Sequence, residues 1–250
     1  CIRDRLTPYI NFLWLFREVV VLKENKDIKY PPTLNYSREI TRRASTVDFL
    51  PLVKIYIMLG LKLPTDPRWV NIVEKNIDEI LTDHAYCEQK AASTAISLII
   101  NFPEYPELVD EMIALSREEM GHFKMVHDRI LKRGMTLGKH RKDEYVIALM
   151  KFFPKGGDRK EQLVHRLLYA AMIEARSCER FRLLSEQLRD KDLAEFYRKL
   201  MISEAGHYTM FLKFAREYGD RENVDAKWQD LLDYEAEIMK DLGDKEAIHG

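Results

Sequence analysis

The sequence has few cysteines, glycines and prolines. Its 250 residues include 3 Cys, 10 Gly and 9 Pro, and no two cysteines are spaced as Cys-x-x-Cys. Three cysteines cannot form a disulfide framework or a typical thiolate zinc site, so we expect a cytoplasmic protein. Scarce glycine and proline, with 46% hydrophobic and 32% charged residues, exclude collagen-like and disordered classes and predict a packed globular fold.

The sequence also lacks a long apolar run and a charge excess. The most apolar stretches, residues 9–22 and 49–61, are interrupted by charged side chains. Neither reaches the roughly 20 apolar residues that span a bilayer, so we expect no membrane partner. The 40 basic and 41 acidic residues nearly balance, which removes the simplest argument for nucleic-acid binding, and we expect no DNA partner.

The first 57 residues differ from the rest of the chain in charge and in apolar pattern. They hold 10 basic and 6 acidic residues, which leaves 30 and 35 for residues 58–250. Within them, residues 23–48 carry Pro31, Pro32, many charges and no sustained apolar period, as a linker does. We expect residues 1–57 to be an N-terminal extension of doubtful order and residues 58–250 to form one compact domain.

Apolar residues that recur every three or four positions predict long helices. We expect four of them over residues 69–102, 107–133, 159–187 and 192–218, with shorter helices over 144–153 and 226–242. No segment shows the period-two alternation of a strand pair. Four long helices with short connections predict an all-α antiparallel four-helix bundle with extra short helices.

Two of the predicted helices carry the same short motif. Glu119-Met-Gly-His122 recurs as Glu204-Ala-Gly-His207, and an aromatic residue follows each copy. Positions i and i+3 of a helix share a face, so one carboxylate and one imidazole can reach a single ion. Glu118 also shares a face with His122, but its counterpart in the second copy is Ser203, which favours Glu119 as the ligand.

Two more glutamates complete the repeat. A two-metal bundle takes one further Glu from each of the other two helices, and Glu88 and Glu174 lie 31 and 30 residues before the Glu of each motif. Four carboxylates balance two divalent ions, and oxygen-rich ligation with two imidazoles suits iron or manganese better than zinc. The predicted metal ligands are therefore Glu88, Glu119, His122, Glu174, Glu204 and His207.

These motifs resemble those of a known family. Residues 83–92, 117–123, 173–181 and 203–208 are similar to segments of the tRNA 2-methylthio-N6-isopentenyladenosine hydroxylases, which are ferritin-like non-haem di-iron monooxygenases. The likeness covers about residues 58–220. It implies a ferritin-like bundle, a centre of two Fe ions held by the same six residues, and an external electron donor or reductase. It further implies tRNA as substrate and O2-dependent hydroxylation of the isopentenyl group at tRNA position 37.

The sequence departs from the family pattern in two places. Gly121 and Gly206 precede the two motif histidines, where many members have arginine. The role of that arginine is therefore in doubt for this chain. Residues 58–69 resemble a natural start, so we expect residues 1–57 to be an addition to the family domain.

A run of cations is the best candidate for tRNA contact. Residues 132–142 contain no acid, and clustered cations release counterions from phosphates. The predicted RNA-binding residues are Arg133, Lys139, Arg141 and Lys142. The alternative is that these cations do not contact RNA and are simply exposed to solvent at the end of a helix, where the helix dipole favours positive charge in any case.

Four further residues have two interpretations each. His84, one turn before Glu88, either holds that carboxylate or packs in the core. Cys178 is either a packing residue or a redox residue. Arg176 and Arg180 either meet phosphate or a ligand carboxylate, or form salt bridges between helices.

Two rival functions remain open. A ferritin-like iron oxidase or peroxidase that does not act on RNA would use the same ligands and would turn over iron or peroxide alone. A helical RNA-binding module without enzymatic activity would contain no iron.

Overall fold

The computed structural model describes residues 59–243, 245 and 247–249. The expected extension over residues 1–57 lies outside the described residues. Within them the chain forms seven helices and no strand, which confirms the predicted all-α class. None of these helices has the length and hydropathy needed to cross a bilayer.

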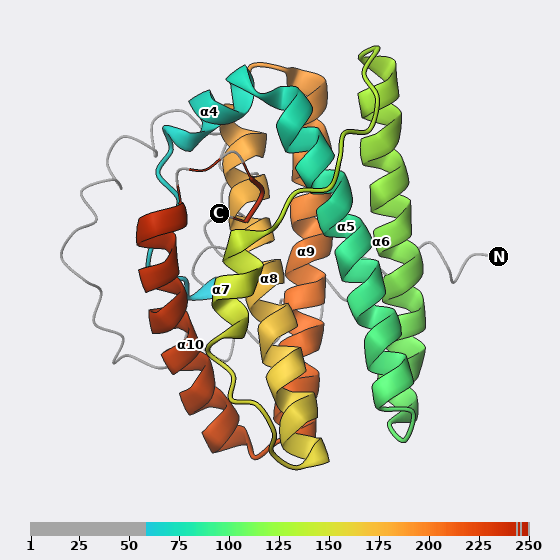
Figure 1. Ribbon diagram of the computed structural model, residues 1–250, viewed down its shortest axis with the longest axis vertical. Helices are drawn as coiled ribbons and strands as arrows, with labels where there is room; N and C mark the ends of the chain where they lie inside the picture. Colours follow the sequence, from blue (N-terminus) through green and yellow to red (C-terminus); the bar gives the residue numbers. More distant parts are fainter. Residues whose placement is uncertain (1–58, 244, 246, 250) are drawn as a thin grey trace, which may run out of the picture. The chain divides into compact units, whose positions relative to one another are not determined.

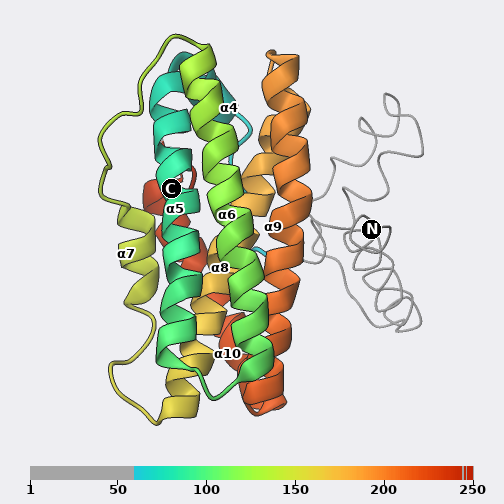
Figure 2. The same ribbon diagram turned by 90° about the vertical axis from the view of Figure 1, so that its right-hand side faces the viewer.

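Four long helices form two antiparallel hairpins (Figure 1). The first hairpin consists of α5 (Ile77–Asn101) and α6 (Pro106–Lys132), and the second of α8 (Arg159–Gln187) and α9 (Lys191–Tyr218). The hairpins meet with α6 beside α9 (Figure 2). The predicted four-helix bundle is therefore confirmed, and each hairpin contributes one Glu-x-x-His motif to it.

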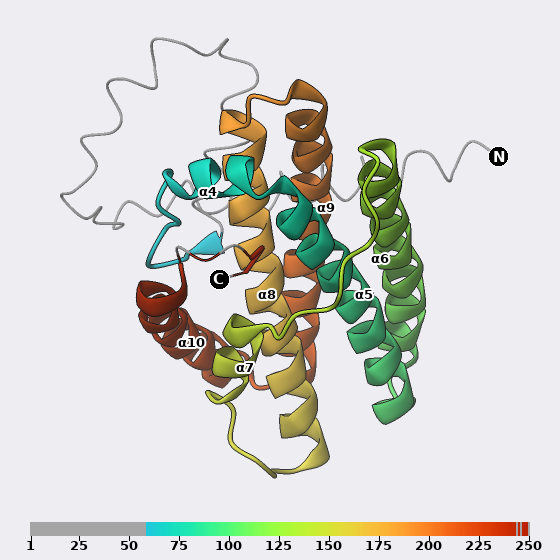
Figure 3. The same ribbon diagram turned by 45° about the horizontal axis from the view of Figure 1, so that its top comes forward.

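Three shorter helices cover the second hairpin. They are α4 (Trp69–Lys75), α7 (Glu144–Met150) and α10 (Arg221–Leu242). α7 and α10 pack against each other and against α8, on the side away from α6 (Figures 1 and 3). Most residues of α8 are buried as a result, including its charged positions Glu174, Arg176 and Arg180.

Aspartate side chains fix where four helices begin. The carboxylates of Asp143, Asp158, Asp190 and Asp220 accept backbone N–H bonds from the first turns of α7, α8, α9 and α10. Such caps satisfy N–H groups that have no partner within the helix. The last of them explains why α10 begins at Arg221, five residues before the predicted start.

The expected single helix over residues 69–102 is two helices. The chain breaks at Asn76, whose φ of −131° and ψ of 38° are not helical. Its backbone N–H bonds to the Val73 carbonyl and its side-chain Nδ2 donates to the Ile72 carbonyl, which closes α4. No glycine or proline marks this break, so the apolar period alone predicted one helix.

A buried ion network ties α8 to α10 and to the segment before α4. Arg176 pairs with Glu235 at 2.7 Å and with Glu179 at 3.1 Å, and Thr65 donates a hydroxyl to Glu179. The salt-bridge interpretation of Arg176 is thereby confirmed. Arg180 instead donates to the carbonyls of residues 243 and 247 and lies over the Trp69 ring, so neither arginine meets a predicted ligand carboxylate.

Candidate metal centre

The six predicted ligands come together between the four long helices. α5 supplies one carboxylate, α8 supplies another, and α6 and α9 each supply a carboxylate and an imidazole, namely Glu88, Glu174, Glu119 with His122, and Glu204 with His207. All six residues are buried, and none is more than 6% exposed. The predicted direction of these residues, into the bundle, is what the structure shows.

The six residues form two overlapping groups. One consists of Glu88, Glu119, His122 and Glu204, and the other of Glu119, Glu174, Glu204 and His207. Within each group the possible ligand atoms lie within 4.8 Å of one another. Glu119 and Glu204 belong to both groups. Two neighbouring cations would each have four of these residues within reach, with Glu119 and Glu204 within reach of both.

Both imidazoles turn their Nδ1 atoms toward the carboxylates. His122 Nδ1 lies 3.4 Å from Glu119 Oε2 and 3.5 Å from Glu88 Oε2. His207 Nδ1 lies 3.0 Å from Glu119 Oε1 and 3.8 Å from Glu174 Oε2. The two ring centroids are 6.2 Å apart. Each motif therefore directs one nitrogen into the same carboxylate-lined space.

Several buried polar atoms in this centre have no hydrogen-bond partner. They are one oxygen each of Glu119 and Glu204 and both ring nitrogens of His207. His207 Nδ1 is 3.0 Å from Glu119 Oε1, but the pair lacks hydrogen-bond geometry. Buried polar atoms without partners are costly, and a cation between them would satisfy the oxygens and the inward nitrogen. The donor set therefore fits a metal ion.

The same burial shifts the pKa values of these groups. Burial and the neighbouring Glu174 carboxylate raise the pKa of Glu204 well above its usual value. Burial alone would lower the pKa of His122, but the carboxylates of Glu119 and Glu88 outweigh it and raise that pKa to about 10. Without a cation, protons partly neutralise the cluster. A divalent ion replaces those protons when it binds.

His84 contacts one of the predicted ligands. Its Nε2 lies 2.6 Å from Glu88 Oε1, and the ring is fully buried beside Phe181 and Tyr197. Both interpretations of His84 therefore apply, since it packs in the core and also holds the carboxylate. Cys178 is buried and its thiol faces the Met201 carbonyl at 3.4 Å, as a packing residue does.

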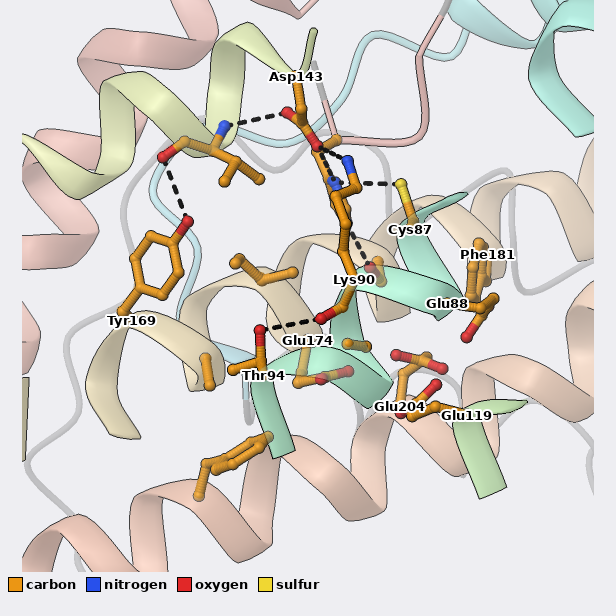
Figure 4. A pocket seen from close by; sticks show the side chains of 17 residues that line it. Cys87, Glu88, Lys90, Thr94, Glu119, Asp143, Tyr169, Glu174, Phe181 and Glu204 are labelled. Atoms are coloured by element: carbon orange, nitrogen blue, oxygen red, sulfur yellow. Dashed lines mark hydrogen bonds and ion pairs between the residues drawn. The ribbon is translucent and has the colours of Figure 1, made fainter. Parts of the chain in front are cut away.

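A small cavity reaches the carboxylates between α5 and α8 (Figure 4). Its volume is about 80 Å³. The apolar part of its wall consists of Ala91, Val146, Ala170, Ile173, Phe181 and Phe211. A space of this size holds a few water molecules or a short hydrocarbon group. It does not accommodate a whole nucleoside.

Polar groups form another part of the cavity wall. Lys90 Nζ lies 2.8 Å from Asp143 Oδ2, and His249 Nδ1 lies 3.3 Å from the same oxygen. His249 Nε2 is within 3.0 Å of Ser177 Oγ. Cys87, Asp143 and His249 are also close enough to hold an ion, but Lys90 already supplies a positive charge there. Burial raises the pKa of the Cys87 thiol well above its usual value, so it stays protonated.

The structure places three of the four predicted RNA-binding cations in two surface hollows. Arg133 pairs with Asp190 at 2.6 Å and lines a hollow of about 390 Å³ together with Lys75 and Arg189. Lys139 is exposed on the loop that leads away from Arg133. The two remaining cations lie in the second hollow.

The second hollow lies next to the cavity of the candidate metal centre. Its volume is about 620 Å³, and Arg141, Lys142, Lys75 and Lys245 are among its lining residues. Asp143 lines both this hollow and the small cavity that reaches the carboxylates. Lys75 and Lys245 were not predicted to lie here, because they are far from residues 132–142 in the chain and no local pattern links them.

The bundle and its buried carboxylate–histidine groups define a ferritin-like protein with a candidate two-metal centre. A family model described as tRNA-(MS[2]IO[6]A)-hydroxylase (MiaE) matches residues 53–250. The chain belongs to this family, as its motifs predicted. The match covers all the described helices and all six candidate ligands.

Named relatives and a solved structure agree with this membership. The chain is 38% identical to a tRNA 2-(methylsulfanyl)-N(6)-isopentenyladenosine(37) hydroxylase of Pseudomonas putida, in an alignment covering 66% of this chain and 78% of the relative. It is 28% identical to the Salmonella typhimurium protein of the same name, over 76% of this chain and 87% of the relative. A Synechococcus structure titled protein 43 with aldehyde deformylating oxygenase activity matches with a TM-score of 0.71 and 30% identity, over 76% of this chain and 95% of that one.

Proposed function

We propose that this protein hydroxylates the isopentenyl group of 2-methylthio-N6-isopentenyladenosine at position 37 of tRNA, in the cytoplasm. The observation that carries the proposal is a pair of overlapping carboxylate–histidine groups that open onto a cavity sized for a short hydrocarbon group. Family membership supplies the substrate, because both named relatives are tRNA hydroxylases of this nucleoside.

The metal ions in this proposal are two irons, held by the six residues of the two groups. When bound, they supply activation of O2 for attack on an unactivated C–H bond. One oxygen atom enters that bond as a hydroxyl group and the other leaves as water. The balance requires two protons and two electrons, and we assign the electrons to an external donor such as a reductase.

The chain's own residues bind and orient the substrate. The apolar wall that includes Ala91, Ile173 and Phe211 would receive the isopentenyl group and exclude water from the carboxylates. Because the cavity is too small for the base, the nucleoside would remain at its mouth. The ion pair of Lys90 and Asp143 lies on the wall that separates this cavity from the 620 Å³ hollow.

The tRNA backbone would lie across the two surface hollows. Lys75 lines both hollows, whose cations lie among acidic residues such as Glu74, Asp143 and Glu144, and we call the combined lining the basic surface. Phosphate contacts by such cations position a nucleic acid without reading its sequence. This surface contains the predicted Arg133, Arg141 and Lys142 and is bordered by Lys139.

Nucleoside mass spectrometry tests the proposed reaction. We expect tRNA from cells with this protein to contain the prenylated adenosine with one additional oxygen atom, and tRNA from cells without it to lack that product. The purified iron-loaded protein with a chemical reductant and O2 should form the same product in vitro. Turnover of iron or peroxide with no oxygenated nucleoside would instead support the iron oxidase or peroxidase alternative.

A further inference from the structure

Glu118 faces the outer nitrogens of both histidines in the candidate metal centre. Its Oε2 lies 3.5 Å from His207 Nε2, and its Oε1 lies 3.9 Å from His122 Nε2. The Nδ1 atoms of the same rings face inward, toward the carboxylates of the two ligand groups. One carboxylate on α6 therefore spans two imidazoles that belong to different helices.

Glu118 differs from the predicted ligands in its surroundings. Its side chain is 50% exposed, whereas the six predicted ligands are buried, and it belongs to neither ligand group. A half-exposed glutamate is ionised at neutral pH. It is therefore an acceptor placed outside the rings, which suits an N–H group and not a metal ion.

Ser203 holds this carboxylate in place from the opposite helix. Its hydroxyl donates to Glu118 Oε1. The two residues occupy equivalent positions in the motif repeat, so the repeat supplies one carboxylate and one hydroxyl where strict symmetry would supply two carboxylates. Two carboxylates at this distance would repel each other. The asymmetry between Glu118 and Ser203 thus lets a single negative charge serve both rings.

The two glycines that precede the motif histidines place no side chain beside this contact. A Cβ atom at Gly121 or Gly206 would meet no heavy atom within 4 Å. Neither position therefore covers the outer nitrogens of His122 and His207. Glu118 is the charged group that the structure places against both of these nitrogens.

We propose that Glu118 is a positioning residue shared by both candidate metal-binding histidines. With metal bound, Glu118 would accept the Nε2–H of His207 and, on closer approach, that of His122, which would fix this tautomer and leave both Nδ1 lone pairs facing the metal pair. Acceptors on the outer nitrogen orient metal-bound histidines and raise their basicity. The inference rests on the metal-binding part of the proposed function and is independent of the substrate.

Titration of the metal-free full chain with Co²⁺ in the absence of O2 tests the proposal. Absorption of bound Co²⁺ and calorimetry report the number and affinity of the sites. We expect Glu118→Ala to weaken both Co²⁺ equivalents by about 10- to 100-fold, the usual effect of removing such an acceptor. Glu111→Gln, an exposed charge change on the same helix, should leave both affinities unchanged.

Glu118→Gln provides a sharper test of sharing. The amide oxygen can accept from one ring only, and its NH2 group faces the other ring as a second donor. We therefore expect one Co²⁺ equivalent to keep nearly its original affinity and the other to weaken. Ser203→Ala, which removes only the hydroxyl, should cause a smaller loss at both sites.

Nitrogen-detected NMR of the diamagnetic Zn²⁺ form reads the tautomers directly. Both rings should carry the proton on Nε2 in the unchanged protein, and Glu118→Ala should lose this uniform pattern. Wild-type affinity for two Co²⁺ in Glu118→Ala, with an unchanged tautomer pattern, would overturn the proposal. So would weakening of only one equivalent in that variant. A failed hydroxylation assay would leave these binding results intact, so the two proposals fail separately.

Discussion

Glu119 and Glu204 occupy the same position in two copies of one motif, and the structure places both in each of the two ligand groups. The remaining residues are divided, with Glu88 and His122 in one group and Glu174 and His207 in the other. A variant that lacks a shared residue should therefore hold fewer metal ions than a variant that lacks an unshared one.

Removal of a shared carboxylate should affect both metal ions. We expect purified Glu204→Ala to contain less than one metal ion per chain, because both groups lose a ligand. Glu88→Ala should retain about one, because the group with Glu174 and His207 stays complete. Metal analysis by mass spectrometry measures both, with Glu111→Gln as the control. Equal losses in the two variants would contradict the sharing of Glu204 by both groups.

Metal binding should stabilise the fold, because the metal-free cluster brings four carboxylates together in a buried space. At a free Fe²⁺ concentration 100 times the Kd, each site adds about 2.7 kcal/mol. Each kcal/mol raises Tm by about 2–4 °C for a domain of this size. Calorimetry under anaerobic conditions, with and without a chelator, measures the shift. Equal Tm values would argue against coupling between metal binding and folding.

Much of the candidate centre was predictable because helix geometry is local. A Glu and a His three residues apart must share a helix face, so the motifs at Glu119 and Glu204 predicted the direction of four side chains. The equal spacing to Glu88 and Glu174 extended the prediction to the other two helices. The structure brings all six residues together, and their role as metal ligands stays a prediction.

Features that depend on long-range contacts were not predictable in this way. His249 lines the cavity through contacts with Ser177 and Asp143, which are 72 and 106 residues away. Lys75 joins the basic surface only because the chain breaks at Asn76 and sets α4 apart from α5. No spacing rule connects these positions, since packing of separate helices decides which residues meet.

Glu118 shows a different limit of sequence reasoning. Comparison of the two motif copies left it out of the predicted ligands, because Ser203 takes its place in the second copy. The same comparison gave it no role. Its contacts with both histidines arise from the approach of α6 to α9, which the repeat does not encode.

The ionised carboxylate of Asp143 should make the free energy of unfolding depend on pH in the acid range. Burial alone would raise its pKa, but His249 and Lys90 outweigh burial and lower it. The stability from this carboxylate is therefore fully present above the unfolded-state pKa of about 3.9 and is lost as pH falls through the lower folded-state pKa.

Asp143→Asn isolates that charge, because asparagine also caps helices well. We expect the variant to lose about 1–3 kcal/mol of unfolding free energy at neutral pH. Its difference from the unchanged protein should shrink as pH falls below 4. Urea denaturation of the metal-free protein at several pH values measures this. A difference that does not vary with pH would mean that the charge contributes nothing.

The basic surface should make tRNA binding sensitive to salt. Replacement of Lys139, Arg141 and Lys142 with Ala should weaken binding and lower the slope of log K against log salt by about 0.7–0.9 per lost phosphate contact. Fluorescence anisotropy with the substrate tRNA at several salt concentrations measures both quantities. Unchanged binding at low salt would reject this surface.

Arg133 should contribute less than Lys142. Its guanidinium already pairs with Asp190, so part of its charge is neutralised before RNA arrives. We expect Arg133→Ala to change tRNA affinity less than Lys142→Ala does. Combined alanine replacement of Lys151 and Lys155, exposed lysines that line neither hollow, provides the matched control and should have no effect.

Filling the cavity should separate substrate binding from metal binding. Ala91 lines the cavity on α5, one turn after Glu88, so Ala91→Leu places additional carbon atoms where the isopentenyl group would enter. Because the ligand groups are untouched, we expect unchanged metal content and at least a tenfold loss of hydroxylated nucleoside, measured by mass spectrometry. Ala114→Leu, at an exposed position on α6, should retain full activity. Full hydroxylation by Ala91→Leu would mean that the substrate reaches the centre by another route, such as the α6–α9 side where Glu118 lies.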